Sequence, residues 1–520
     1  MWASLRKLIK AKHVYAPGIP DADCLILEDE NIAWVGQYPA VKYLDLPIDK
    51  IIDAQGFFVA PGFVDSHVHL SATGAGLTGL NLLDTKSAKE ALQKLSDYVR
   101  KTQDQFIIGH GWDDTNWPDA ELWNLAEVKP IIGDRHLYLS RIDVHSALVN
   151  TPSYQGLVKQ EEHHQVRKFV QDHLPGEQRK RQIRAALELA ASYGVVSVHE
   201  NGGPFVSGEA DFLDVMSISK EGRLPQVFAY WGSTNLDEVK DLGAYGAAGD
   251  LTVDGSIGSM TAFLSEPYVG TDKTGTEFLT SEQISDHLVA CTKAGMQGGF
   301  HAIGDAALEN IIIGIKAAQK IVGQDAFRLA KHRIEHAEML DSSHLEFLAS
   351  AGVILSMQPV FDELWGNASG LYEQRLGNHR SSQMNSFNAI SKAGVTLAFS
   401  SDSPVTPINP WRAIKAATEH HTTQHRLSAR AAFTAHTRGG WRGVKDENNG
   451  VIAPGLPANL ALWEVSEYTI KIPDGRLRAW STDERSGTPP LPDLTDELPT
   501  CVGTMSQGKA IYDPRGLLTT

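Results

Sequence analysis

The stretch PGFVDSHVHL places two histidines, His67 and His69, one residue apart at the end of an apolar run. Because side chains alternate along a strand, both imidazoles would point to the same face. Two imidazoles at a strand end are either metal ligands or polar residues where a strand meets solvent. The choice between them depends on whether other parts of the chain supply further ligands.

Three more polar residues close later candidate strands. His301 follows the run MQGGF, His336 ends HRIEH and Asp402 ends GVTLAFSSD. Imidazole nitrogens with a carboxylate suit Zn²⁺ or a similar divalent ion. Such an ion lowers the pKa of bound water from 15.7 toward about 7, and a neighbouring carboxylate can accept the proton. Together with the HVH pair, these residues predict a metal site that activates water.

The middle of the chain alternates candidate strands with helical segments, which predicts a (β/α)₈ TIM barrel. A barrel brings the carboxyl ends of its strands to one mouth, where the five polar residues would meet. A long insertion, about residues 71–180, follows the first strand and carries strands of its own at 106–112 and 135–143. We expect it to fold over the mouth. The eight predicted barrel strands are 56–67, 194–200, 226–231, 250–255, 296–302, 332–337, 352–359 and 394–402.

Both ends of the chain read as short strands divided by turns, with no helical pattern of useful length in the first 60 residues. The ends of a domain often lie close together, so the two ends could build one small β-sandwich domain. The expected plan is a sandwich from residues 1–60 and 446–520 around a barrel at 61–445.

The composition excludes several classes of partner. The 63 acidic residues exceed the 47 basic ones, for a net charge of -16, which argues against nucleic acids and anionic membranes. Three cysteines fit neither a disulfide framework nor a thiolate zinc site, and they favour a reducing cytoplasm. No apolar run is long enough to cross a bilayer. We therefore expect a cytoplasmic protein with a small-molecule substrate.

Five segments carry a resemblance to a known family: PGFVDSHVHL, HAIGDAA, RIEHA, SSDSPV and APGLPANLALW. They resemble the metal-dependent amidohydrolase superfamily, and more narrowly its amidohydrolase-3 branch, which includes YtcJ-like proteins and N-substituted formamide deformylases. GHGWDD, HSALVN and DGSIGSMTA are similar to further segments of that branch. The resemblance spans nearly the whole chain and implies a (β/α)₈ barrel with a β-sandwich from both ends.

Carried over position by position, the resemblance implies a set of ligands and a reaction. Metal-activated hydroxide would attack an amide, formamide or cyclic amide carbon and cleave a non-peptide C–N bond. Asp402 would bind metal and act as general base, and His336 would be a second catalytic residue. Zn²⁺ is the expected metal, as one or two ions. The implied ligands are His67, His69, His301, His336 and Asp402.

The fourth strand departs from the family pattern. Many relatives carry a carboxylated lysine there that bridges two metals, whereas AAGDLTVDGS has no lysine and places Asp250 near that position. Asp250 or Glu200 could serve as an alternative ligand. A single-metal site with a structural Asp250 is slightly favoured.

Four other residues have a functional and a structural interpretation. Trp112 and Asp113 could line the substrate pocket, or they could be a structural tryptophan and a turn aspartate. His145 could contact substrate or an oxyanion, or it could be a buried hydrogen-bonded histidine. Arg333 could bind a carboxylate or orient the end of its strand.

Two alternative functions and the assembly state stay open. A deaminase of a heterocycle usually needs a glutamate close to the fifth-strand histidine, but the acids following His301 are Asp305 and Glu309. A catalytically silent binding scaffold is the second alternative, although the complete ligand set argues against it. A homodimer is compatible with the sequence.

Overall fold

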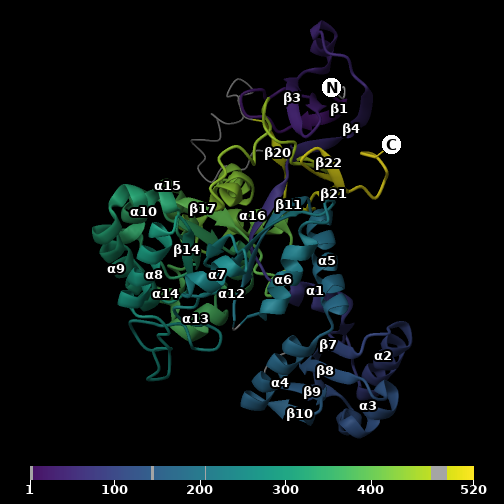
Figure 1. Ribbon diagram of the computed structural model, residues 1–520, viewed down its shortest axis with the longest axis vertical. Coiled ribbons are helices and arrows are strands. Elements are labelled where there is room, and N and C mark those ends of the chain that lie inside the picture. Colours follow the sequence, from purple (N-terminus) through teal and green to yellow (C-terminus); the bar gives the residue numbers. More distant parts are fainter. Residues whose placement is uncertain (1–3, 142–145, 205, 470–488, 520) are drawn as a thin grey trace. The chain divides into compact units, whose positions relative to one another are not determined.

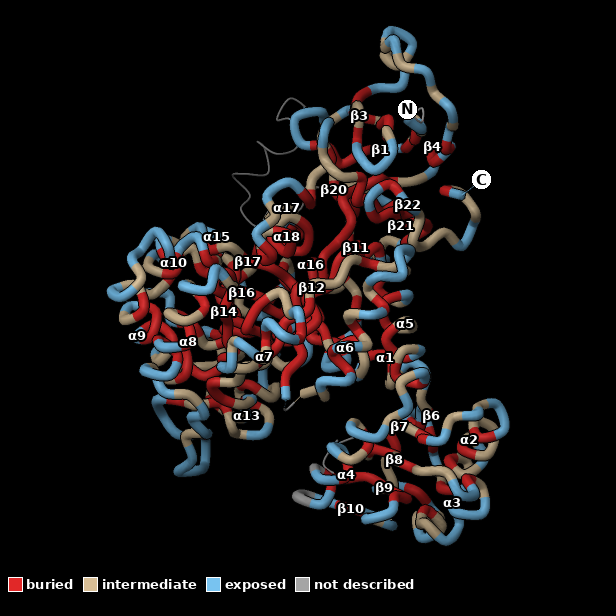
Figure 2. Tube along the Cα trace, in the orientation of Figure 1, coloured by how far each residue is buried: buried red, intermediate tan, exposed pale blue. Residues whose placement is uncertain are grey.

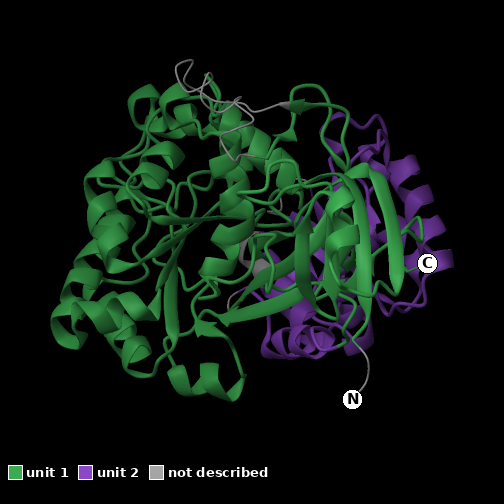
Figure 3. Ribbon diagram, turned by 90° about the horizontal axis from the view of Figure 1, so that it is seen from above, with its two compact units in different colours: residues 1–68, 188–204, 221–520 green, residues 69–187, 205–220 purple. Residues whose placement is uncertain are grey.

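The computed structural model describes residues 4–141, 146–204, 206–469 and 489–519. It divides into two compact units, shown in Figure 3. Unit 1 comprises residues 1–68, 188–204 and 221–520, and unit 2 comprises residues 69–187 and 205–220. Among the described residues, no helix combines the length and apolar character that crossing a membrane requires.

Unit 1 contains the predicted barrel, which confirms the fold class. Eight parallel strands form one sheet, and a bridge from Val68 to Ser403 joins its two edges. The backbone N–H of Asp402 also donates to the carbonyl oxygen of His67 at 2.9 Å. Helices surround the strands in Figure 1. In order around the sheet the strands are β5 (Phe63–Val68), β11 (Val195–Gly202), β12 (Gln226–Trp231), β13 (Gly246–Ala247), β14 (Gln297–Ala302), β15 (Arg333–His336), β16 (Ile354–Met357) and β17 (Thr396–Phe399).

The helices that follow the later strands lie outside the sheet. They bury an apolar face, as in α9, where Leu308, Ile311, Ile312 and Ile315 are buried. Strand residues are almost all buried, as Figure 2 shows, because the barrel packs side chains on both faces of the sheet. The principal helices of unit 1 after β12 are α7 (Leu236–Asp241), α8 (Ser281–Lys293), α9 (Asp305–Val322), α10 (Gln324–Ala330), α11 (Leu345–Ala351), α12 (Pro359–Trp365), α13 (Leu371–Leu376), α14 (Asn378–Ser381), α15 (Phe387–Lys392), α16 (Pro410–Glu419), α17 (Ala429–Thr434) and α18 (Gly440–Gly443).

Two predicted barrel strands were wrong in their limits. The run predicted as one strand at 56–67 is two strands in different sheets, and the chain passes between them at Gly62. A Cβ at Gly62 would lie 2.3 Å from Val196 Cγ1, so the crossing needs glycine. The strand predicted at 250–255 is instead the two-residue β13, and Gly249 leaves it with a φ of +85°. Asp250 therefore follows the fourth strand.

Strands from both ends of the chain join one seven-stranded sheet in unit 1. Successive residues of β2 (Cys24–Glu28) face opposite sides of the sheet. Leu25 and Leu27 enter one apolar cluster, while Cys24 and Ile26 enter another. The sheet order is β22 (Lys509–Tyr512), β21 (Thr500–Ser506), β18 (Leu460–Glu464), β4 (Lys50–Pro61), β1 (Arg6–Val14), β2 (Cys24–Glu28) and β3 (Asn31–Gly36).

Unit 2 has its own five-stranded sheet and apolar core. Strands β7 (Phe106–Trp112) and β8 (His136–Arg141) confirm the two strands predicted within the insertion. The other strands are β6 (Leu80–Asn81), β9 (Ser146–Asn150) and β10 (Gln155–Lys159). The helices are α1 (Leu70–Thr78), α2 (Ala88–Lys101), α3 (Leu125–Ile132), α4 (Gln160–His173) and α6 (Glu209–Ile218), and most of α5 (Gly176–Ser192) also belongs to this unit.

Candidate metal centre

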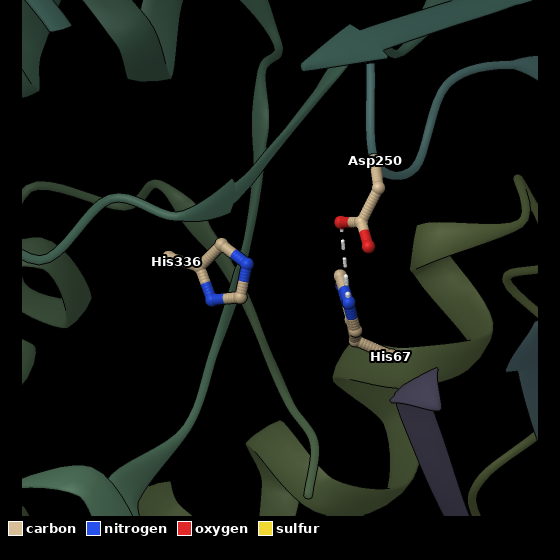
Figure 4. Close-up of side chains that lie close together, drawn as sticks. All are labelled: His67, Asp250 and His336. Atoms are coloured by element: carbon tan, nitrogen blue, oxygen red, sulfur yellow. Dashed lines mark ion pairs between the residues drawn. The ribbon is translucent and has the colours of Figure 1, made fainter. Parts of the chain in front are cut away.

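Five polar side chains converge at the carboxyl ends of the barrel strands of unit 1. His67 lies on β5, Asp250 follows β13, His301 lies on β14, His336 ends β15 and Asp402 follows β17. His67 Nε2 is 3.6 Å from Asp250 Oδ1 and 3.5 Å from Asp402 Oδ1. His301 Nδ1 is 3.7 Å from the same oxygen of Asp250. Figure 4 shows His67, Asp250 and His336 around a common point.

The spacing of these donor atoms fits a small divalent ion. Ligand atoms of His67, Asp250 and His336 all lie within 4.8 Å of one another. In a tetrahedral zinc site with bonds near 2.1 Å, neighbouring ligand atoms are about 3.4 Å apart. The distances of 3.5 to 3.7 Å between nitrogens and carboxylate oxygens are close to that value. The donor set and its spacing therefore suit a borderline metal such as Zn²⁺.

Two of the five residues have backbone conformations that L-residues rarely adopt. His336 has a φ of 70° and Asp402 a φ of 54°. Such conformations cost about 1–3 kcal/mol each and cluster at functional sites, where the surrounding structure enforces them. Here they turn the chain at the ends of β15 and β17, where the two side chains reach the centre. Local sequence gives no sign of this turn.

The carboxylates create a field that favours positive charge at the centre. Burial alone lowers the pKa of His301, but Asp250 and Asp254 outweigh it and raise the pKa to about 9. Burial also lowers the pKa of His67, and Asp250, Asp402 and Glu335 raise it above its ordinary value. The same carboxylates would attract a divalent cation. His336 differs, because burial and the two neighbouring histidines lower its pKa to about 4.

Buried partners fix the orientation of the histidine rings. His67 Nδ1 lies 2.9 Å from Glu335 Oε2, and His336 Nδ1 lies 2.9 Å from Gln358 Oε1. These contacts leave Nε2 of each ring as the atom for a metal, which is the usual role of such outer partners. Neither Glu335 nor Gln358 was predicted from the sequence. The available signal was a charged pair, Arg333 and Glu335, on one face of a buried strand.

Asp254 anchors the segment that runs beside His301. Its Oδ1 accepts a hydrogen bond from Ile303 N at 3.0 Å, and its Oδ2 accepts from Gly304 N and Phe263 N, both at 2.8 Å. Next to Asp254, the carbonyl oxygen of Gly255 lies 3.3 Å from His301 Nε2. That contact directs His301 Nδ1 toward Asp250.

The remaining candidates in unit 1 are Arg333 and Glu200. Arg333 is fully buried and donates to both oxygens of Glu335, so the carboxylate it binds belongs to the protein itself. Glu200 is buried on β11 beside Val68 of β5. Among the described residues, it belongs to no group of three potential ligands within 4.8 Å.

The other four sequence-predicted residues, His69, Trp112, Asp113 and His145, belong to unit 2. His69 is the first residue of unit 2 and occupies the position just before α1. In the same unit, Trp112 is buried and donates from its indole to the carbonyl oxygen of Leu139 at 2.9 Å. Asp113 caps a short turn and pairs with Arg141 at 2.7 Å. His145 falls outside the described residues. A substrate-binding role for Trp112, Asp113 and His145 stays a prediction.

Known proteins resemble this chain over most of its length. A profile described as "Amidohydrolase family" matches residues 50–512. The putative amidohydrolase YtcJ of Bacillus subtilis is 23% identical, and the alignment covers 86% of this chain and 92% of that protein. The N-substituted formamide deformylase of Arthrobacter pascens is 20% identical, with coverage of 84% and 89%.

A solved structure extends the likeness to three dimensions. The crystal structure of an uncharacterized metal-dependent hydrolase from Pyrococcus furiosus superposes with a TM-score of 0.74 at 27% identity. The match covers 90% of this chain and 99% of that one.

Proposed function

Because this chain belongs to the amidohydrolase family, we propose that it is a metal-dependent hydrolase that cleaves an amide, formamide or cyclic amide C–N bond outside peptides. The observation that carries the proposal is the convergence of two carboxylates on His67 Nε2, at 3.5 and 3.6 Å, from strand ends far apart in the sequence. The name of the Arthrobacter relative supports this bond type.

We assign the metal to the converging side chains, with Zn²⁺ as the expected ion and one or two ions bound. The ligands proposed from the structure are His67, His301, His336 and Asp402, with Asp250 as an alternative ligand. His69 joins them as the second histidine of the HVH motif. A bound divalent ion supplies a Lewis acid that polarises the scissile carbonyl and lowers the pKa of a water toward about 7.

Asp402 is the proposed general base. The backbone N–H of Asp402 donates to the carbonyl oxygen of His67 at 2.9 Å. This hydrogen bond fixes the turn that carries the Asp402 carboxylate. In the reaction, Asp402 accepts a proton from the attacking water as the C–O bond forms. It then donates this proton to the leaving nitrogen as the C–N bond breaks.

The proposal is tested first by metal content and then by substrate screening. Purified protein grown with Zn²⁺ should hold close to one equivalent of divalent metal or more. Less than about a tenth of an equivalent in correctly folded protein would exclude the metal centre. The reconstituted protein should then hydrolyse a member of a panel of N-formyl, N-acyl and cyclic amide compounds. Complete inactivity across all three groups would exclude the proposed bond type.

Asp402→Asn tests the general base. We expect the variant to retain metal but to lose about 10²–10⁴-fold in kcat, because the neutral amide cannot accept the proton. The matched control is Asp341→Asn, since that carboxylate caps a turn by accepting from Ser343 N at 2.7 Å. Wild-type turnover in the Asp402 variant would refute its role.

A heterocycle aminohydrolase is the alternative that one observation favours. Glu338 is buried, accepts a hydrogen bond from the Tyr372 hydroxyl and interacts electrostatically with His301. It is therefore a closer candidate for a proton donor than Asp305, whose carboxylate binds Ser265. Release of ammonia from an aminated heterocycle, without cleavage of any amide in the panel, would favour this alternative.

A further inference from the structure

A fully buried ion pair lies directly behind the metal centre, inside the barrel. Arg333 and Glu335 stand two residues apart on β15, and both side chains are 0% exposed. The guanidinium donates from Nε to Glu335 Oε1 and from Nη2 to Oε2, the second at 3.0 Å. The same Oε2 atom lies 2.9 Å from His67 Nδ1. One carboxylate thus joins the arginine to the metal-site histidine.

The arginine is itself held on several sides. Its Nη2 donates to the carbonyl oxygen of Ser66 at 2.6 Å, and its Nη1 lies 3.2 Å from His199 Nδ1. The guanidinium stands 4.5 Å from the ring centre of Tyr230, in the geometry of a cation–π contact. Burial and Arg333 together hold the pKa of His199 well below its usual range, so its ring is neutral and accepts at Nδ1. These contacts leave the arginine little freedom to move.

Stability is a poor explanation for this pair. Taking two charges out of water is costly, and well-packed apolar residues in place of a buried ion pair are often as stable or more stable. The Glu335 carboxylate also contacts His67, a proposed metal ligand. A carboxylate behind a metal-binding histidine fixes the ring and strengthens its nitrogen as a ligand.

We propose that Arg333 and Glu335 are positioning residues of the metal centre: Arg333 fixes both oxygens of Glu335, and Glu335 holds His67 with Nε2 directed at the metal. The inference rests on the proposed function, because it concerns affinity for the same metal. Neither residue touches substrate. Arg333 acts on the centre only through Glu335.

Two double variants separate positioning from stability. Arg333→Met with Glu335→Leu replaces the pair by apolar side chains and removes the acceptor of His67 Nδ1. Arg333→Met with Glu335→Gln removes both charges but keeps an amide oxygen as acceptor. Single variants are less useful, since each leaves a buried charge without its partner. The matched control is Glu238→Gln, whose carboxylate accepts from Trp231 and Ser233, at 2.7 and 2.9 Å.

The measurements are the Zn²⁺ affinity of metal-stripped protein, by titration against a competing chelator, and its melting temperature. We expect both double variants to melt within a few degrees of wild type. The Leu variant should bind Zn²⁺ about 10–100-fold more weakly, as is usual when such a partner is lost. The Gln variant should lose less, because its acceptor remains, and Glu238→Gln should bind as wild type does.

Three other outcomes decide against the inference or its premise. Wild-type Zn²⁺ affinity in both double variants would overturn the positioning role. If both double variants fail to fold, the Arg333–Glu335 pair is required for stability, and this outcome would also overturn the positioning role. Failure of the wild-type protein to bind Zn²⁺ would instead refute the proposed metal centre, which distinguishes the two claims.

Discussion

The substitution Asp254→Asn tests how the fold holds His301 in the proposed metal centre. Asp254 is fully buried, and its two oxygens accept three backbone hydrogen bonds from Ile303, Gly304 and Phe263. An asparagine can keep the two bonds to Oδ2 by placing its oxygen there. Its NH₂ group then faces the N–H of Ile303, so that two donors meet in a buried position.

The expected cost follows from these contacts. The orphaned N–H of Ile303 costs about 1–3 kcal/mol. The two remaining bonds change from a charged to a neutral acceptor and lose about 1 kcal/mol each. A total of about 3–5 kcal/mol corresponds to an increase of about 10²–10⁴-fold in local opening. Because Gly255 contacts His301 Nε2, Zn²⁺ affinity should fall about tenfold as well.

Hydrogen exchange followed by mass spectrometry measures this opening without unfolding the whole chain. Peptides that contain the amides of Ile303, Gly304 and Phe263 should lose about 100-fold or more in protection. The control is Asp305→Asn. Asp305 accepts from the backbone N–H and the hydroxyl of Ser265, and asparagine can satisfy both groups, since the hydroxyl can also accept. Its peptides should exchange as in wild type.

Exchange of the Ile303 and Gly304 amides at the wild-type rate in Asp254→Asn would contradict this prediction. The carboxylate would then not be what holds the turn after β14. Faster exchange with unchanged Zn²⁺ affinity would keep the anchoring role but would refute its connection to His301.

Two further predictions concern acid stability and the fourth strand. Burial lowers the pKa of His332 from 6.5 to about 3, so the stabilisation by its neutral ring is complete above pH 6.5 and is lost as the pH falls below that value. Between pH 8 and pH 5, urea unfolding of metal-free protein should show wild type losing about 2 kcal/mol more than His332→Asn; equal losses would contradict this. Asp250→Asn should weaken Zn²⁺ binding measurably, because Asp250 Oδ1 lies 3.6 Å from His67 Nε2 and 3.7 Å from His301 Nδ1. Unchanged metal content and affinity in that variant would support a purely structural Asp250.

Much of the architecture could be predicted from local patterns. Apolar runs with polar residues at their ends indicated the barrel strands and the candidates His67, His301, His336 and Asp402, because strand periodicity and burial act within a few residues. The limits of the fourth strand could not be predicted this way. There, Gly246 and Gly249 shorten the strand, and a Cβ at Gly249 would lie 2.7 Å from Asn201 Oδ1 of another strand.

The partners of the metal-site residues depended on contacts between distant segments. Glu335 lies 268 residues from His67 in sequence, and Asp254 lies 49 and 50 residues from the two amides after His301 that it binds. No local rule pairs such residues, since their proximity results from closing the sheet. The left-handed turns at His336 and Asp402 depend on the same closure, because the surrounding contacts enforce a conformation that the residues by themselves disfavour.

The amino-acid sequence was therefore sufficient to predict the donor types, their order along the chain and the end of the barrel at which they would lie. Those properties follow from residue chemistry and from the period of a strand. The three-dimensional fold was needed to show which nitrogen of His67 and His336 faces the proposed centre, and that a buried arginine lies behind His67. Orientation depends on hydrogen bonds across the barrel, and these exist only once its eight strands have closed.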